Sequence, residues 1–350
     1  MKQWVTNQDG LDKLQLVDVP EPSELKDGEV LVKIRSVSLN FRDTEVCMGE
    51  YGHHKTIKTG SEIVPTSDCC GLVVKLGLGA GDLGLKEGDR VAPIFIQTHL
   101  TGQIVEKDMA SGLGLPLSGC LTQYRVFPAY GLVKVPDYLT DDEAACLPIA
   151  SVTAWMSLNS FQPIGQPLRG KEVVLLQGTG GVAIAGLQIA KALGLTTIIT
   201  SSSDKKLELA KGLGADHTIN YKNTPDWDEV VLKLTDGRGA DIVLECGGTQ
   251  TLGKSFRCVA FGGLINAIGY LSGKQDTTGD LNANVLALRR NVTFKGIING
   301  PKDRFEEVLR FYESERIEPV IDRKFEFEEA DEALKYLFSG SHFGKVVVKV

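Results

Sequence analysis

The glycine-rich stretch "EVVLLQGTGGVAIAGLQIAKALG" constrains the fold of this chain more than any other part of the sequence. An apolar strand ends at Gln177 and leads directly into a helix. Gly178 and Gly180 at the junction, followed by Ala183, match the pattern G-x-G-x-x-G/A. A lone pattern of this kind also fits an ordinary strand-to-helix turn, but here further strand and helix units follow it.

In this pattern the first glycine permits a tight turn, the second lets the backbone approach a pyrophosphate, and the third small residue lets helix and strand pack closely. The start of the helix adds unpaired N–H groups and the positive end of a dipole, which favour phosphates. The turn therefore predicts a dinucleotide site. The residues expected to contact the dinucleotide here are Gly178, Thr179, Gly180, Gly181 and Val182.

The next strand, "TTIITSSSDKK", indicates which dinucleotide is preferred. Enzymes that use NAD usually carry an acid at the end of this strand, whereas enzymes that use NADP carry hydroxyls and cations there. Ser201, Ser202 and Ser203 stand at the place of the acid, and Lys206 follows within one turn. Ser203 or Asp204 could also serve only as the cap of the next helix, and Asp204 could reach back to the ribose of NAD. The pattern favours NADPH over NAD.

The chain changes its rhythm at about residue 141. Residues 1–140 hold short β-branched runs cut by Gly and Pro, which predict a compact β-rich domain. Helical and strand-like stretches alternate through residues 141–300, which predicts a doubly wound parallel sheet of the Rossmann type, because parallel neighbours need a crossover connection. The elements of residues 301–350 are too few to fold alone, so we expect them to complete the N-terminal domain. The expected fold class is α/β.

Composition and charge argue against several classes of partner. The 350 residues carry a net charge of -7 with acids and bases interspersed, so no basic stripe is available for nucleic acid or an anionic membrane. No apolar run approaches the roughly 18 residues of a membrane span, and the N-terminus lacks the apolar core of a signal peptide. Seven cysteines without framework-like spacing are typical of reduced thiols. We expect a cytoplasmic protein that acts on a small molecule.

Two groups of potential metal ligands occur in the first half of the chain. "EIVPTSDCCGLVV" contains the adjacent Cys69 and Cys70, and "CMGEYGHH" contains Cys47, His53 and His54. Successive residues of a strand point to opposite faces, so Cys69 and Cys70 are poorly placed to hold one ion. The two histidines lie in what we expect to be a surface loop, where such pairs are usually solvated. Neither group predicts a metal site.

Several motifs together give the chain a family resemblance: "SVSLNFRD", "VPTSDCCGLVVKLG", "GDRVAP", "LPIASVTAW", "VVLLQGTGGV", "ITSSSDKK", "ADHTINY" and "HFGKVVV". With them the chain resembles the medium-chain dehydrogenases/reductases over its whole length, closest to the zinc-type alcohol dehydrogenase-like and quinone oxidoreductase branches. The resemblance implies a GroES-like fold for the β-rich catalytic domain. It also implies a homodimer, often joined through the last strand of the nucleotide domain, here "VTFKGIING".

The resemblance also identifies the positions at which zinc-using members carry their ligands. A cysteine would stand at Asn40, a histidine followed by glutamate at Ser67 and Asp68, and a third ligand at about Ile149. Asparagine, serine and isoleucine do not supply the thiolate or imidazole ligands of a catalytic zinc. The family's structural-zinc lobe of four closely spaced cysteines is missing as well. We expect an enzyme without zinc, in which Asp68 bonds Asn40 or only shapes a turn.

The resemblance implies roles for individual residues. In the quinone-reductase branch the asparagine matching Asn40 lies beside the nicotinamide, and the threonine matching Thr153 contacts the cofactor. Lys206 and Tyr221 match contacts to the 2′-phosphate, although Tyr221 could serve only for packing. Tyr51 is a candidate proton donor or substrate clamp, or else an ordinary tyrosine of a surface loop.

Two further segments, "LECGG" and "AIGY", follow strands at the sheet edge where ligands bind in open α/β folds. We expect small residues there to make room for the ribose and nicotinamide. The candidate residues are Cys246, Gly247, Gly269 and Tyr270. Cys246 could instead be a reactive thiol, although a packed cysteine at a strand end is more common.

These features favour an NADPH-dependent, zinc-independent oxidoreductase that transfers hydride to an activated C=C bond or a quinone. Such acceptors suit a site without metal, because the enolate or hydroquinone anion can be stabilised by hydrogen-bond donors. Two alternatives stay open at this point. One is an NAD(P)-dependent alcohol dehydrogenase with an unusual metal or none, and the other is a non-catalytic NADPH-binding sensor or structural protein.

Overall fold

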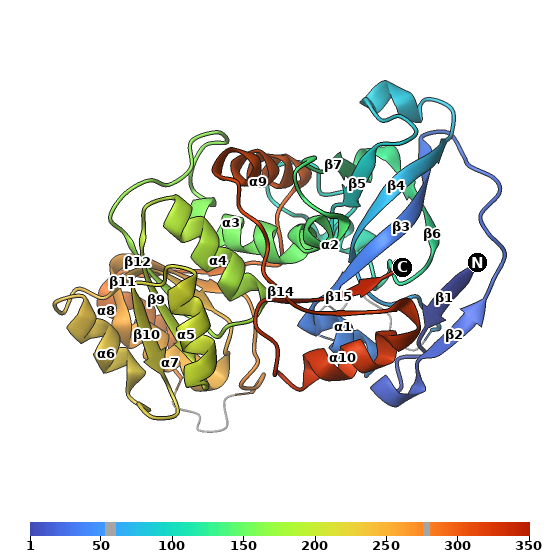
Figure 1. Ribbon diagram of the computed structural model, residues 1–350. Coiled ribbons are helices and arrows are strands. Elements are labelled where there is room, and N and C mark those ends of the chain that lie inside the picture. Colours follow the sequence, from blue (N-terminus) through green and yellow to red (C-terminus); the bar gives the residue numbers. More distant parts are fainter. Residues whose placement is uncertain (53–60, 276–280) are drawn as a thin grey trace. The chain divides into compact units, whose positions relative to one another are not determined.

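The computed structural model describes residues 1–52, 61–275 and 281–350 (Figure 1). Contacts among these residues divide the chain into two compact units. The first unit comprises Met1–Val152 and Asn299–Val350, and the second comprises Thr153–Ile298. No helix in the described ranges is long and apolar enough to cross a membrane.

The second unit is built on a six-stranded parallel sheet in the order β10-β9-β8-β11-β12-β13. Its strands are β8 (Val173–Gln177), β9 (Thr196–Ser201), β10 (His217–Asn220), β11 (Ala240–Glu245), β12 (Val259–Ala267) and β13 (Thr293–Gly296). The first strand in the sequence, β8, lies beside the fourth, β11, so the strand order reverses between them. This is the doubly wound order of dinucleotide-binding sheets, and the expected α/β class with a Rossmann sheet is confirmed.

Helices cover both faces of this sheet. They are α3 (Val152–Asn159), α4 (Gly181–Ala192), α5 (Asp204–Gly212), α6 (Trp227–Leu234), α7 (Thr249–Cys258) and α8 (Ala283–Arg290). Trp227 of α6 and Phe256 of α7 join the core on the face of Leu175. The next strand residue, Leu176, points to the opposite face and meets α4 at Gly186. Both faces of β8 are therefore buried, which explains its continuous apolar sequence.

The first unit contains a seven-stranded sheet in the order β14-β15-β3-β4-β5-β7, with β6 also paired to β3. Its strands are β3 (Glu29–Leu39), β4 (Asp68–Leu76), β5 (Arg90–Pro93), β6 (Tyr124–Pro128), β7 (Leu132–Lys134), β14 (Ile321–Phe325) and β15 (Lys345–Lys349). A separate antiparallel pair is formed by β1 (Lys2–Val5) and β2 (Gln15–Asp18). Because β15 pairs with β3, the two ends of the chain contribute neighbouring strands to one sheet.

Helices of different lengths accompany this sheet. The α-helices are α1 (Phe41–Cys47), α2 (Asp141–Ala145), α9 (Lys302–Glu315) and α10 (Ala330–Phe338). Short 3-10 helices occur at Leu11–Lys13, Ala80–Leu83, Glu106–Ser111, Ala129–Gly131 and Phe327–Glu329. A π-helical turn, Leu147–Ser151, follows α2.

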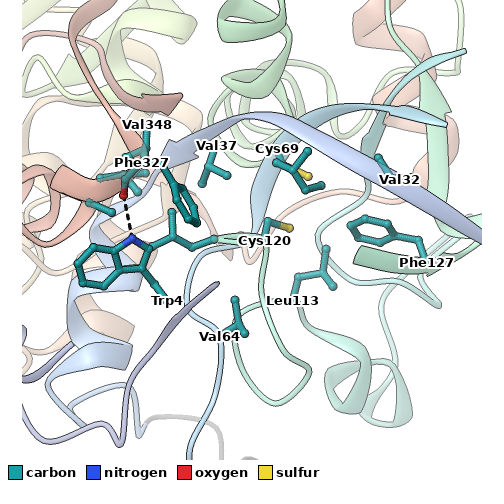
Figure 2. Packing of buried hydrophobic residues seen from close by; sticks show 14 of the residues in the cluster. Trp4, Val32, Val37, Val64, Cys69, Leu113, Cys120, Phe127, Phe327 and Val348 are labelled. Carbon is teal, nitrogen blue, oxygen red and sulfur yellow. Dashed lines mark hydrogen bonds between the residues drawn. The ribbon is translucent and has the colours of Figure 1, made fainter. Parts of the chain in front are cut away.

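The core of the first unit joins residues from distant parts of the chain (Figure 2). The indole Nε1 of Trp4 donates a hydrogen bond to the carbonyl oxygen of Phe327 at 2.8 Å. Cys69 and Cys120 lie in the same apolar cluster. Cys70, the next residue of β4, instead directs its thiol to the Asp141 carboxylate at 3.7 Å. The two adjacent cysteines are thus buried separately, as the alternation of a strand predicts.

Candidate functional site

The turn between β8 and α4 has the geometry that the glycine pattern predicts. Gly178 has φ of +80°, a left-handed conformation that residues with a Cβ rarely adopt, and Gly180 is the N-cap of α4. In the described part of the chain no side chain caps this helix. The first N–H groups of a helix have no acceptor within it, so the turn from Gly178 to Val182 fits the pyrophosphate of a dinucleotide.

The close packing of α4 depends on a residue that the sequence pattern did not identify. Ala183, the third small residue of the pattern, is 2% exposed. A Cβ atom added at Gly186 would lie 3.0 Å from Leu176 Cδ2 and 3.1 Å from Leu244 Cδ2. The helix therefore also packs tightly against the sheet about one turn beyond Ala183, at Gly186. The only sequence signal was a glycine within an otherwise apolar helix, "VAIAGLQIA".

Thr153 contributes an unsatisfied polar group to the second unit. Its side chain is buried at 2% exposure, and its Oγ1 has no hydrogen-bond partner among the described residues. An unsatisfied buried hydroxyl costs on the order of 1–3 kcal/mol, so such groups usually have a function or a bound partner. The position fits a hydrogen bond to a cofactor.

The end of β9 brings five of the predicted cofactor residues together. Ser203 is the N-cap of α5, and its Oγ accepts a hydrogen bond from the backbone N–H of Lys206 at 3.4 Å. The backbone N–H of Tyr221 donates to the carbonyl oxygen of Ser201 at 3.1 Å, and the Tyr221 side chain is 42% exposed. Ser202 lies between the two serines and is partly exposed. Ser203 can therefore cap α5 while the exposed parts of Ser202 and Tyr221 remain accessible to a cofactor.

Asp204 is the acid that could have served NAD in this turn. Its Oδ1 accepts a hydrogen bond from Asn220 Nδ2 at 2.6 Å. The carboxylate is therefore engaged by the end of β10.

A buried hydrogen-bond network joins the ends of β8 and β11, and sequence reasoning missed it. Gln177 Nε2 donates to Glu245 Oε2 at 2.8 Å, and Gln177 Oε1 accepts from the N–H groups of Cys246 and Gly247 at 3.2 Å each. Glu245 Oε1 also accepts from the N–H groups of Gly247 and Gly248 at 2.9 and 3.0 Å. The network fixes the loop after β11, where the strand order reverses. Its signal in the sequence is a polar residue at the end of each buried strand.

The loops after β11 and β12 are held against each other by glycines. Gly248 has φ of +95°, and a Cβ atom there would lie 2.7 Å from the Cα of Tyr270. A Cβ atom at Gly269 would lie 3.0 Å from the carbonyl oxygen of Cys246. Burial, reinforced by the Glu245 carboxylate, raises the pKa of the Cys246 thiol to about 12. Cys246 therefore stays protonated at neutral pH and does not have the character of a reactive thiolate.

In the first unit, Asn40 stands at the junction of β3 and α1 with both ends of its amide engaged. Its Nδ2 donates a hydrogen bond to Asp68 Oδ2 at 3.0 Å. Its Oδ1 accepts one from the ammonium of Lys345 at 2.7 Å. The side chain is partly exposed. These two contacts fix which end of the amide points to which partner.

Asp68 is fully buried and is hydrogen-bonded to residues at all three positions at which zinc-using relatives carry ligands, Asn40, Ser67 and Ile149. Besides Asn40, its Oδ2 accepts from the backbone N–H of Ile149 at 3.2 Å, and its Oδ1 accepts from Ser67 Oγ at 3.3 Å. Burial raises the pKa of the Asp68 carboxyl, although Lys345 and these donors act in the opposite direction. Of the alternatives for Asp68, the hydrogen bond to Asn40 is present, and Asp68 is the first residue of β4.

Lys345 is the functional candidate that sequence reasoning missed. Lys345 is 5% exposed, and its ammonium donates hydrogen bonds to the carbonyl oxygen of Leu39 and to Asn40 Oδ1, both at 2.7 Å. The Nζ atom is 4.0 Å from Asp68 Oδ2. A lysine at the start of the apolar run "KVVVKV" was the available signal, because a buried charge in a strand requires partners.

Tyr51 lies beside Arg42, whose side chain is 10% exposed. Tyr51 itself is 7% exposed, so the alternative of an exposed loop tyrosine is wrong. The guanidinium carbon of Arg42 is 4.7 Å from the centre of the Tyr51 ring and 4.8 Å from that of Phe95. Arg42 Nη1 also lies 3.2 Å from Asp43 Oδ1. The cation thus sits between two rings and beside a carboxylate.

The zinc-ligand positions do not fit a zinc ion. Ile149 offers only a hydrocarbon side chain, Ser67 is bonded to Asp68, and the Asn40 amide is held between Asp68 and Lys345. An ammonium group at this place would also repel a divalent cation. Within residues 1–52, 61–275 and 281–350 no group of three or more His, Cys, Asp or Glu side chains could hold a metal ion.

The structure describes only one member of the second group of potential ligands, Cys47, His53 and His54. Cys47 belongs to the apolar core, and burial, followed by the Asp43 carboxylate, raises the pKa of its thiol. His53 and His54 lie outside the described residues.

Comparison with known proteins gives matches to both units. A family model described as alcohol dehydrogenase GroES-like domain matches residues 26–137, and one described as zinc-binding dehydrogenase matches residues 181–314. A zinc-type alcohol dehydrogenase-like protein of Schizosaccharomyces pombe is 40% identical over 342 residues, which cover 97% of this chain and 96% of that protein.

Solved structures agree along the whole chain. An NAD-dependent alcohol dehydrogenase is 31% identical with a TM-score of 0.85, and a mycobacterial protein complexed with NADPH is 25% identical with a TM-score of 0.80; each match covers 100% of both chains. A 2-haloacrylate reductase is 26% identical with a TM-score of 0.76, over 100% of this chain and 99% of that one. The chain therefore belongs to the zinc-type alcohol dehydrogenase-like group of the medium-chain dehydrogenase/reductase superfamily and is an NAD(P)-dependent oxidoreductase.

Proposed function

We propose that this oxidoreductase reduces an activated C=C bond or a quinone with NADPH and does so without zinc. One observation carries the proposal. The Asp68 carboxylate accepts hydrogen bonds from Asn40 and from the N–H of Ile149, two positions at which zinc-using relatives carry ligands. Zinc would polarise the oxygen of an unactivated ketone or alcohol. Residues that only donate hydrogen bonds suit acceptors whose negative charge develops on an accessible oxygen. The similarity to a 2-haloacrylate reductase, named for a conjugated alkene, supports this substrate class.

In the proposed reaction, NADPH held by the turn from Gly178 to Val182 would supply a hydride to the β carbon of an enone or to a quinone. The electron pair of the double bond moves onto the carbonyl oxygen, and a proton then completes the reduced product. Asn40 would donate a hydrogen bond to that oxygen or to the nicotinamide amide. Tyr51 is the proposed proton donor or substrate clamp, and Thr153 the proposed cofactor contact. We also propose residues 1–140 with 301–350 as the catalytic domain and residues 141–300 as the cofactor domain.

The preference for NADPH over NAD is proposed from the turn after β9. Three serines, Ser201 to Ser203, stand there with Lys206, and these hydroxyls and the cation suit a 2′-phosphate. The one acid of the turn, Asp204, is bonded to Asn220. Tyr221 beside them would border the adenosine.

A direct test uses the purified protein before and after chelation, with its metal content determined by mass spectrometry. NADPH and NADH would each be offered with a panel of quinones, enones and simple ketones, and NADP and NAD with simple alcohols. We expect quinone or enone turnover with NADPH that is unchanged by chelation. Stoichiometric zinc with chelator-sensitive alcohol oxidation would favour the alcohol dehydrogenase alternative, which the 31% identity to such an enzyme makes a specific rival. NADPH binding without turnover across the panel would favour a sensor.

We further propose that the protein is a homodimer joined through β13. This strand pairs only with β12 in the described part of the chain, so one edge of it is available. Phe294 and Ile298, on the strand and just after it, are 44% and 37% exposed. All seven cysteines are free thiols, which fits the reducing cytoplasm we propose as its compartment.

A further inference from the structure

The buried ammonium of Lys345 has a specific arrangement of partners. It donates to the carbonyl oxygen of Leu39 and to Asn40 Oδ1, both at 2.7 Å, and lies 4.0 Å from Asp68 Oδ2. A buried cation is costly unless it is paired and hydrogen-bonded, and here both conditions are met. If the lysine served only to join β15 to β3, the contact with Leu39 would suffice. The additional contact with the Asn40 amide calls for an explanation.

The contact with Lys345 determines the orientation of the Asn40 amide. An ammonium only donates hydrogen bonds, so the atom facing it must be the amide oxygen. The amide nitrogen then points to Asp68, which accepts one of its two hydrogens at 3.0 Å. No acceptor for the second hydrogen occurs among the described residues. Lysine and aspartate together therefore leave one N–H of a partly exposed amide available.

We propose that Lys345 is a positioning residue, which holds the Asn40 amide so that its free N–H donates to the reacting oxygen. A reversed amide would present lone pairs to an oxygen that is gaining negative charge. The ammonium also polarises the amide through its oxygen, which makes the remaining N–H a stronger donor. Lys345 thus supplies through Asn40 part of the positive charge that a metal supplies in zinc-using relatives. The inference rests on the proposed function in that Asn40 must touch the reactants.

The test is a double-mutant cycle between Lys345 and Asn40. Lys345→Met removes the charge at nearly constant length and should lower kcat by roughly 10- to 100-fold, as expected for a weakened oxyanion donor, with little change in KM for NADPH. Asn40→Ala should cause a similar loss. If the lysine acts through the amide, Lys345→Met should lower kcat no further in the Asn40→Ala background, although its effect on the melting temperature should persist.

Two further variants make the cycle robust. Lys345→Met leaves the Asp68 carboxylate without its cation, so Asp68→Asn/Lys345→Met, compared with Asp68→Asn alone, repeats the measurement in a neutral site. Lys349→Met, on the exposed last position of β15, is the matched control and should leave kcat unchanged. Equal kcat losses from Lys345→Met with and without Asn40 would overturn the positioning role, and so would an unchanged kcat in a folded variant.

The failure of this inference can be distinguished from the failure of the proposed function. The cycle is measured with whichever acceptor or alcohol the wild-type protein turns over best. The wild-type protein could instead oxidise an alcohol in a metal-dependent reaction. Coupling between Lys345 and Asn40 in that reaction would uphold the positioning role and reject the proposed substrate class. Additive effects with a quinone would do the reverse. A wild-type protein that turns over nothing would overturn both.

Discussion

Lys206 follows the serines of the β9–α5 turn and is the residue proposed to pair with a 2′-phosphate. Lys206→Ala should weaken NADPH binding by about 1.5–3 kcal/mol, which corresponds to roughly 10- to 150-fold, because a charge-assisted hydrogen bond is lost. NADH binding should be nearly unchanged, since NADH lacks the phosphate. Titration calorimetry with both cofactors measures the difference. Lys205→Ala, a neighbouring exposed lysine, is the matched control, and an equal loss in both variants would contradict the assignment.

Titration of Asp43 should make the stability of the protein depend on pH. Its Oδ1 lies 3.2 Å from Arg42 Nη1, and its Oδ2 accepts the backbone N–H of Asn40 at 2.8 Å. Burial nevertheless raises the pKa of its carboxyl from 3.8 to about 6, with Asp68 adding to the rise and Arg42 and Lys345 opposing it. Between about pH 4 and pH 6 the folded protein therefore binds more protons at Asp43 than the unfolded chain. The free energy of unfolding should fall as the pH rises through this window.

The variant Asp43→Asn should flatten that fall. The difference in unfolding free energy between wild type and variant should change by up to about 3 kcal/mol from pH 4 to pH 6, because one pKa unit corresponds to about 1.4 kcal/mol. Urea unfolding at several pH values gives the slopes, and Asp82→Asn serves as a control at an exposed aspartate. Parallel pH profiles for wild type and Asp43→Asn would show that burial does not act as described.

Local signals in the sequence identified some of these residues and could not identify others. The glycines at 178, 180 and 181 and the serines at 201–203 could be proposed from the sequence because each proposed task involves only a few neighbouring positions. The contact between Lys345 and Asn40 joins residues 305 positions apart, and the one between Gln177 and Glu245 joins residues 68 apart. No local pattern specifies such pairs, since they form only when strands are placed side by side.

At the scale of elements, the approach of α4 to its sheet depends on Gly186. The Cβ atom of a valine there would lie 3.0 Å from Leu176 Cδ2 and 3.1 Å from Leu244 Cδ2, which is closer than ordinary van der Waals contact. Gly186→Val should lower the free energy of unfolding by roughly 1–3 kcal/mol through overpacking. It should also weaken cofactor binding, because α4 begins at the turn proposed to face the phosphates. Chemical denaturation and calorimetry measure the two effects.

The matched control for this change is Gly212→Val in α5. A Cβ atom at Gly212 would meet nothing within 4 Å, so the same substitution there tests the helix preference of valine alone. We expect a change of no more than about 0.5 kcal/mol. Comparable losses at both positions would attribute the effect at Gly186 to propensity rather than to packing.

The alternation of strand-like and helical stretches was enough to predict the parallel sheet, since each βαβ unit is formed by neighbouring segments of the sequence. The π-helical turn Leu147–Ser151 was not predicted, because its function is visible only in space: its Ile149 N–H reaches Asp68. Tyr51 was open to two interpretations because the sequence does not reveal that the Arg42 guanidinium lies over its ring.

At the scale of the whole molecule, the proposed dimer through β13 can be tested with a charge. Phe294→Lys places a lysine on the edge strand and should shift the protein from dimer to monomer in sedimentation equilibrium. Leu209→Lys on α5, where the leucine is 47% exposed, is the control and should leave the mass unchanged. A monomeric wild type would reject the proposal. Because Phe294 also contacts Phe256 at 5.6 Å between ring centres, thermal melting must confirm that the variant is folded.

The pairing of β15 with β3 has a consequence for how the protein is made. Residues 153–298 form a contiguous unit, whereas the first unit needs strands from both sides of it. On the ribosome the contiguous unit has emerged and can fold while β3 still lacks its C-terminal neighbour. Lys345 belongs to that late strand, so in the nascent chain the environment of Asn40 is among the last parts of the protein to be assembled.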